Sequence, residues 1–220
     1  MIFALSLLTI SAPLPAELSE ALESPEDAPL PVYVAAYETS ELNVTAKVDP
    51  AQPEGQRITV LSPRREDWPK GLEKQLAEFE ADTDGDIWCD TAEELIGGDV
   101  AEISRDEHSI SYRFPMAIEE GGDKADKAFA DASHGEVDIT RTDDVSWRVA
   151  ALRIRLDKPF KPAMVAKVTK LDVDISCSPA ANGRMYQART QTGIEGSAFG
   201  RSFSETEVME LRSVSLPSAN

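Results

Sequence analysis

The chain has 220 residues, with 22 Lys and Arg against 40 Asp and Glu, and its formal net charge at pH 7 is −18. A chain of this length can form one or two compact domains with a buried core. The acidic excess disfavours nucleic-acid binding, because the chain lacks the surplus of cations that neutralises a phosphate backbone. No run of 18 apolar residues occurs in the sequence, so no membrane-spanning helix is expected.

The first 16 residues have the pattern of a secretory signal peptide. Residues 1–10 are almost wholly apolar, and the small residues and prolines that follow predict cleavage after Ala16 or near Ala12. No Lys or Arg precedes the apolar run, and a buried N-terminal strand is the alternative. Residues 17–31 are acidic and proline-rich, which is typical of a disordered linker. The expected location is the periplasm or the extracellular medium.

Charge is unevenly distributed along the chain. Residues 1–110 contain 7 basic and 24 acidic residues, whereas residues 111–220 contain 15 basic and 16 acidic residues. The segment 148–170 holds seven basic residues and one acid, Asp157. A solvated face explains this basic band, and the alternative is that it meets an acidic partner or an anionic lipid surface.

Most of the region 32–216 alternates apolar and polar residues, which predicts antiparallel strands. A helix is expected over 69–82, where Leu72, Leu76 and Phe79 share one face, and a short helix over 123–132. The expected strands and hairpins are 32–48 with 57–61, 100–104 with 109–114, 136–141 with 145–156, then long strands over 163–177 and 184–194, and a last pair over 197–216.

Two of the predicted strands change which of their faces is apolar. The change falls near Ala150–Ala151 in one strand and near Thr169–Lys170 in the other, and one inserted residue in each, a β-bulge, explains it. Long bulged antiparallel strands curl a sheet. The predicted fold class is therefore mainly β, a single curved antiparallel sheet or half-barrel with two short lid helices, forming one domain over residues 32–216.

The order of these elements resembles the LolA/LolB-like periplasmic half-barrel proteins. Most of the likeness lies in the C-terminal half, in the stretch 135–149, in Lys158-Pro-Phe-Lys-Pro162 and in the long strands that continue to Val214. Members of that group enclose a hydrophobic cavity between a curved sheet and lid helices and carry acyl chains. The resemblance implies an acyl or lipid ligand.

Five apolar residues are candidates to line such a pocket, and an ordinary core is the alternative explanation for each of them. These residues are Trp147, Val149, Phe160, Met164 and Phe199.

Cys89 and Cys177 are the only cysteines in the sequence. An even number of cysteines in an exported protein favours a disulfide, and two buried free thiols are the alternative.

An acidic stretch beginning at Asp82 approximates a calcium-binding loop. Its candidate ligands are Asp82, Asp84, Asp86, Asp90 and Glu93. The position that needs glycine for the sharp turn holds Ile87, so an acidic loop that caps the preceding helix is the alternative. No other cofactor is expected.

Catalytic groups are scarce. The two histidines, His108 and His134, fall in a predicted turn and a predicted loop, and the sequence contains no phosphate-binding loop, no HExxH motif and no nucleophile elbow. We therefore expect a non-catalytic, exported binding or carrier protein of the cell envelope. A structural or protein-interaction module that uses the charge asymmetry is the first alternative, and a hydrolase of unknown type is the second.

Overall fold

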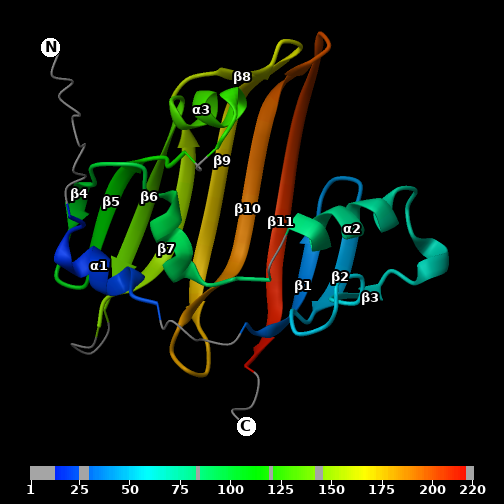
Figure 1. Cartoon of the computed structure of the whole chain (residues 1–220), viewed down its shortest axis with the longest axis horizontal. Helices are drawn as coiled ribbons and strands as arrows, with labels where there is room; N and C mark the ends of the chain where they lie inside the picture. The colour runs from blue at the N-terminus through cyan, green and yellow to red at the C-terminus, as the bar shows by residue number, and fades with distance from the viewer. Residues whose placement is uncertain (1–12, 25–29, 83–84, 119–120, 142–145, 217–220) are drawn as a thin grey trace, which may run out of the picture.

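Eleven antiparallel strands form one sheet, which is not closed into a barrel (Figure 1). The computed structural model describes residues 13–24, 30–82, 85–118, 121–141 and 146–216. The strands are β1 (Val32–Glu38), β2 (Asn43–Val48), β3 (Ile58–Ser62), β4 (Ala101–Arg105), β5 (Ser109–Pro115), β6 (Ser133–Thr140), β7 (Arg148–Leu156), β8 (Phe160–Ala163), β9 (Ala166–Pro179), β10 (Met185–Ala198) and β11 (Arg201–Ser215). Their order across the sheet is β3-β2-β1-β11-β10-β9-β7-β6-β5-β4, and β8 pairs with β9 off this path.

The fold class predicted from the sequence, a mainly β chain with a single antiparallel sheet, is confirmed. Three long strands, β9, β10 and β11, occupy the middle of the sheet, between the N-terminal strands β1–β3 and the strands β4–β7. The first strand of the chain, β1, pairs with the last, β11: Tyr33 lies opposite Val214 and Tyr37 opposite Met209. This pairing joins residues that are more than a hundred positions apart.

Short helices cover parts of one face of the sheet (Figure 1). They are α1 (Ala16–Leu22), α2 (Leu72–Asp82), α3 (Lys124–Ala130) and the 3-10 helices η1 (Arg65–Asp67) and η2 (Cys89–Leu95). Helix α3 begins at a capping box, because the Asp123 carboxylate accepts bonds from Ala125 and Asp126 and the Asp126 carboxylate accepts one from the Asp123 amide.

The buried side chains form separate clusters instead of one continuous core. The largest lies beneath α1 and η2, where Leu18 and Cys89 pack against strand residues such as Ile110 and Ile139. A second cluster centres on Tyr33 and Ile87. A third cluster consists of Val44, Ala46 and Leu72, and it packs α2 against β2.

Both predicted β-bulges are confirmed. In β7 the partners of Asp138 and Ile139 are Ala151 and Val149, which leaves Ala150 as the inserted residue. In β9 the partners of Glu195 and Gly196 are Lys170 and Val168, which leaves Thr169 unpaired in the register. A reversal of hydrophobic parity within a strand therefore located each insertion correctly.

Several segments differ from the sequence prediction. Residues 32–48 form two strands, because a turn at residues 39–42 closes with a bond from the Leu42 amide to the Thr39 hydroxyl. Residues 201–215 form one long strand, and β8 is an additional short one.

The expected linker over 17–31 begins with an ordered helix. Residues 1–12, which make up most of the expected signal peptide, lie outside the described residues. Residues 25–29 of the expected linker lie outside them as well. Helix α1 buries Leu18, Ala21 and Leu22 against the sheet. Their spacing is that of an amphipathic helix, with Glu17 and Glu20 outside this stripe.

The predicted disulfide between Cys89 and Cys177 is confirmed, with Cα atoms 6.4 Å apart. It joins the start of η2 to β9 near the end of the long central strand. The segment that leads into η2 also pairs with β10, because the Gln187 amide donates to the Ile87 carbonyl at 2.8 Å. Together these bonds fix η2 over the middle of the sheet.

We predict that Cys89→Ser and Cys177→Ser each lower the free energy of unfolding by a similar amount, about 4 kcal/mol, because either change releases an 88-residue loop. Urea unfolding of both single variants and the double variant measures the effect. The double variant should be no less stable than either single one. Two reactive thiols per wild-type chain after denaturation without reductant would contradict the disulfide.

A second prediction concerns two strand glycines. A Cβ atom at Gly135 would lie 2.2 Å from the ring of Phe114, which is 2 % exposed and has no room to move. Gly135→Ala should therefore lower the free energy of unfolding by about 1–3 kcal/mol through overpacking. Gly193→Ala is the matched control, because nothing lies within 4 Å of its Cβ position. Equal denaturation midpoints for the two variants would refute this account.

Candidate functional site

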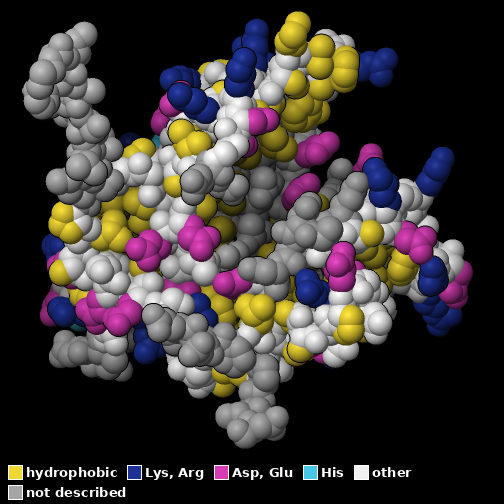
Figure 2. Space-filling view, viewed as in Figure 1, with side chains coloured by type: hydrophobic (Ala, Val, Ile, Leu, Met, Phe, Trp, Pro, Cys, Tyr) yellow, Lys and Arg dark blue, Asp and Glu magenta, His cyan; other side chains and the backbone are white. Residues whose placement is uncertain are grey.

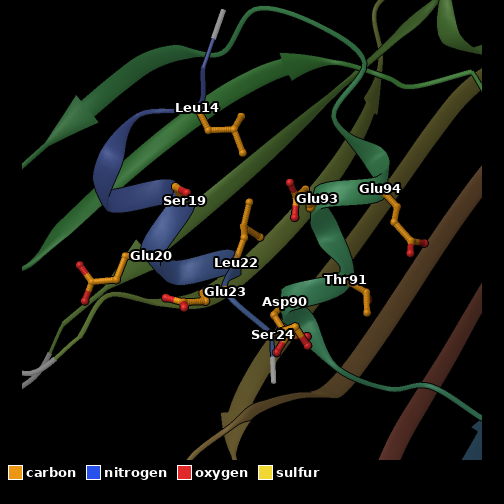
Figure 3. A pocket seen from close by; sticks show the side chains of 10 residues that line it. All are labelled: Leu14, Ser19, Glu20, Leu22, Glu23, Ser24, Asp90, Thr91, Glu93 and Glu94. Atoms are coloured by element: carbon orange, nitrogen blue, oxygen red, sulfur yellow. The ribbon is translucent and has the colours of Figure 1, made fainter. Parts of the chain in front are cut away.

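A concave surface lies between α1 and η2, and we call it the α1–η2 cleft. Its volume is about 710 Å³. Its lining residues are Leu14, Ser19, Glu20, Leu22, Glu23, Ser24, Asp90, Thr91, Glu93 and Glu94. Figure 3 shows Leu14 and Leu22 pointing toward the space between the two helices and Glu93 facing it from η2, whereas the side chains of Glu20 and Glu94 point outward from it. The cleft therefore combines a small apolar floor with an acidic rim.

An adjoining hollow of about 550 Å³ continues the cleft toward the ends of β7 and β10. The two spaces share Glu20, Glu23, Ser24 and Asp90. The second space also has cationic lining, because Arg148 and Arg184 border it. Arg148 is held in place by a bond to the Gly183 carbonyl.

Arg184 holds the junction between the two spaces together. Its Nε and Nη2 atoms donate to the Asp90 carboxylate at 2.5 and 2.7 Å, and Nη2 also donates to the Ser24 hydroxyl at 2.6 Å. The guanidinium lies 4.5 Å from the centre of the Trp88 ring. Both charged side chains are about nine-tenths buried. A single residue, just before β10, thus connects the segment after α1, η2 and a buried tryptophan.

Two carboxylates of helix α1, those of Glu17 and Glu20, anchor the helix to the rest of the fold. Glu20 accepts a bond from the Trp147 amide at 3.2 Å. Glu17 pairs with Arg105 at 3.0 Å. The pKa of Glu17 is lowered, first by a hydrogen bond from its own backbone amide and then by the bond from Arg105. These contacts hold the helix in place and leave other carboxylates of the cleft without a cation.

Three rim carboxylates, those of Glu23, Glu93 and Glu94, are exposed. Among the described residues no ion pair joins any of them to a Lys, Arg or His. The cleft therefore presents a local surplus of negative charge next to apolar side chains.

The residues proposed as calcium ligands do not converge in the described part of the chain. The Asp90 carboxylate is held by Arg184, and Asp86 accepts a bond from the Trp88 amide at 2.7 Å. The Asp82 side chain and Asp84 lie outside the described residues. Among described residues no group of three or more His, Cys, Asp or Glu is arranged to hold a metal ion.

The five residues proposed to line a ligand pocket are not brought together. Trp147 and Val149 are buried in the cluster beneath α1 and η2. Phe160 packs against Phe129 of α3, with ring centres 5.8 Å apart. Met164 and Phe199 are 99 % and 81 % exposed in turns between strands.

The basic band at residues 148–170 divides into two parts. On β7, Arg153 and Arg155 pair with carboxylates of the neighbouring strands, such as Asp138 and Asp174. The later lysines, apart from Lys170, have no ion pair among described residues.

The two histidines differ from each other in environment. His108 lies in the exposed β4–β5 turn, as expected. His134, predicted to lie in a loop, belongs instead to β6; its side chain is 14 % exposed and its Nδ1 atom lies 2.9 Å from the Asp157 carboxylate.

Comparison with known proteins identifies no relative: the chain matches no protein-family model, no curated protein and no solved structure. The part of the predicted resemblance that stands is a large antiparallel sheet that is not closed. None of the described helices has the length and apolar character needed to cross a membrane. The disulfide is consistent with an oxidising extracytoplasmic compartment.

Removing one partner of the Asp90–Arg184 pair should strongly destabilise the fold. We expect Asp90→Ala to lower the free energy of unfolding by about 3–5 kcal/mol, because it leaves a buried guanidinium without its counter-charge. Adding Arg184→Met should restore part of the loss, since the unpaired charge disappears. Chemical denaturation of the two single variants and the double variant measures this coupling. Simple additivity of the two changes would show that the pair does not act as a unit.

Proposed function

We propose that this protein is a non-catalytic, exported binding protein of the cell envelope that recognises a basic segment of a partner protein at the α1–η2 cleft. The observation that carries the proposal is the set of uncompensated carboxylates of Glu23, Glu93 and Glu94 beside the apolar side chains of Leu14 and Leu22. A peptide that alternates Lys or Arg with apolar residues complements both features, because its cations meet the rim and its apolar groups meet the floor.

The anchoring of both sides of the cleft supports this proposal. The disulfide fixes η2 on the sheet, and Arg184 joins Asp90 of η2 to Ser24 after α1. A site of fixed shape loses little conformational entropy when it binds a ligand. Export is supported by the disulfide and by the apolar N-terminal residues of the sequence.

The alternative proposal is an acyl carrier of the LolA/LolB-like kind. It needs an apolar cavity shared by the predicted lining residues. Trp147 lies in a packed cluster, whereas Met164 and Phe199 face solvent, so these positions do not bound one space. The open sheet is compatible with an acyl carrier. The charged lining of the cleft favours recognition of a basic protein segment over an acyl chain.

A peptide-binding experiment tests the cleft. We expect a fluorescein-labelled peptide of alternating Lys and Leu to bind the full chain, and its Glu and Leu counterpart not to bind, in fluorescence anisotropy. The triple variant Glu23→Gln/Glu93→Gln/Glu94→Gln should bind at least about tenfold more weakly, since it removes three charge contacts worth up to about 1 kcal/mol each.

The matched control is Glu41→Gln/Glu54→Gln/Glu66→Gln. It changes net charge by the same amount, but its residues lie in the turns after β1 and β2 and in η1. Equal weakening by the two triple variants would mean that overall charge, not the cleft, attracts the peptide, and would contradict the proposed site.

Native mass spectrometry distinguishes the acyl-carrier alternative. We expect the chain purified from an envelope fraction to carry no acyl ligand and to take up no fatty acid when one is added. A stable complex with one acyl chain per protein would support the carrier alternative and contradict our proposal.

A further inference from the structure

Two turns at one end of the long strands form an exposed apolar surface, which we call the hairpin tip. It comprises the β8–β9 turn (163–166) and the β10–β11 turn (198–201). Met164 is 99 %, Phe199 81 % and Val165 50 % exposed. Figure 1 shows these turns projecting beyond α3 at the top of the view. Figure 2 shows hydrophobic side chains gathered at that end, with basic side chains on either side.

The two turns are joined to each other. The Phe199 amide donates to the Val165 carbonyl at 2.9 Å. Both hairpins are closed by strand pairing up to the turn, because Ala163 lies opposite Ala166 and Ala198 opposite Arg201. The base of β8 is supported by contact of Phe160 with Phe129 of α3. The apolar side chains therefore lie on one preformed surface.

The backbone of Phe199 adopts a positive φ of 50°, and it is the only described non-glycine residue that does so. The two-residue turn Phe199–Gly200 has positive φ at both positions, where Asn, Asp and Gly are preferred because bulky side chains fit this region poorly. The large aromatic side chain is 81 % exposed, so packing against the fold does not compensate for this conformation. An unfavourable residue at an exposed position points to a role outside the fold itself.

The two chain segments that carry the tip are basic. Residues 158–169 and 196–204 together contain four basic residues and no acidic residue. These four, all exposed, are Lys158, Lys161, Lys167 and Arg201. Among described residues none of their side chains forms an ion pair. Exposed apolar side chains flanked by these cations complement a surface with negative head groups above an apolar layer.

We propose that the hairpin tip docks onto the surface of an anionic phospholipid bilayer. Met164, Val165 and Phe199 enter the boundary between head groups and acyl chains, and the four cations contact the lipid phosphates. Each membrane-proximal cation strengthens such binding about fivefold. This docking surface is separate from the α1–η2 cleft and does not depend on the function proposed for it.

The net charge of −18 does not prevent this docking, because only charges close to the bilayer are felt at physiological ionic strength, where the Debye length is about 8 Å. The β9 strand runs from the tip at Ala166 to Cys177, where η2 is attached, and eleven residues of strand span roughly 36 Å. The acidic cleft is therefore screened from a bilayer that touches the tip.

Vesicle co-sedimentation of the full chain tests the proposal. We expect binding to vesicles of phosphatidylglycerol and phosphatidylcholine in equal parts, and little binding to pure phosphatidylcholine. Met164→Ser/Phe199→Asn should weaken binding at least about tenfold, since it removes two apolar side chains from the contact. The melting temperature should not fall, because Asn tolerates positive φ better than Phe.

Matched controls separate the tip from general surface properties. Leu61→Ser/Ile103→Ser removes two exposed apolar residues on the edge strands β3 and β4 and should bind like the wild type. Lys161→Gln/Lys167→Gln/Arg201→Gln should weaken binding strongly. The control Arg64→Gln/Arg65→Gln/Lys70→Gln makes the same charge change away from the tip and should have little effect.

A reporter variant locates the contact. Met164→Trp should show a blue shift of tryptophan emission on vesicles with phosphatidylglycerol, measured against the wild type, and quenching by brominated lipids.

The proposal is overturned if the wild-type chain does not bind these vesicles, or if the tip and control variants bind alike. Retention on immobilised polyglutamate without vesicle binding would assign the tip to an acidic protein and also overturn it. The cleft variant Glu23→Gln/Glu93→Gln/Glu94→Gln should bind vesicles no more weakly than the wild type.

Discussion

The bond between Cys89 and Cys177 is the constraint on which the arrangement of the helices depends. The chain passes from α2, which packs on the N-terminal strands, to η2, which lies over the middle of the sheet. Along this passage Ile87 packs in one buried cluster and Cys89 in another. A short stretch of irregular backbone therefore links two separate cores, and the disulfide holds it at one register on β9. The disulfide, together with the Gln187–Ile87 and Arg184–Asp90 bonds, holds the η2 wall of the α1–η2 cleft in place.

The strands could be predicted to a large extent because their signals are local. Alternation of apolar and polar residues identifies a strand, and a break in that alternation identifies a bulge, as at Ala150 and Thr169. Pairing of the first strand with the last could not be predicted in this way. It depends on which sheet edge is free after the long strands form, and no residue of β1 alone specifies β11 as its partner.

The candidate site was harder to predict than the fold. Glutamates and prolines dominate residues 17–31 and masked the helical spacing of Leu18, Ala21 and Leu22, which was the available signal for α1. Arg184 was not identified, because its role depends on contact with Asp90 across 94 positions of sequence. The apolar residues Met164 and Phe199 were assigned to a pocket, since an apolar residue in a strand pattern is normally buried. Only their place in turns reveals that they face solvent.

The charge asymmetry of the sequence becomes a spatial separation in the fold. The carboxylates of Glu23, Glu93 and Glu94, which have no ion pair within the described part of the chain, lie by the cleft, and the cations without one there lie near the hairpin tip. Between them the charges on β6, β7 and β9 are largely compensated, because Arg153 pairs with Asp138 of β6 and Arg155 with Asp174 of β9. A paired ladder of charges exerts little field at a distance, so the two ends act on their surroundings independently.

This separation gives the long central strands a mechanical role under the two proposals. Strands β9 and β10 pair along almost their whole length, with two register shifts. A chain docked by the tip would hold its acidic cleft away from the bilayer, at the far end of roughly 36 Å of strand. A basic partner could then be bound without competing with the lipid for the same cations or carboxylates. The open sheet serves in this arrangement as a spacer between two surfaces of opposite charge, and it needs no internal cavity to do so.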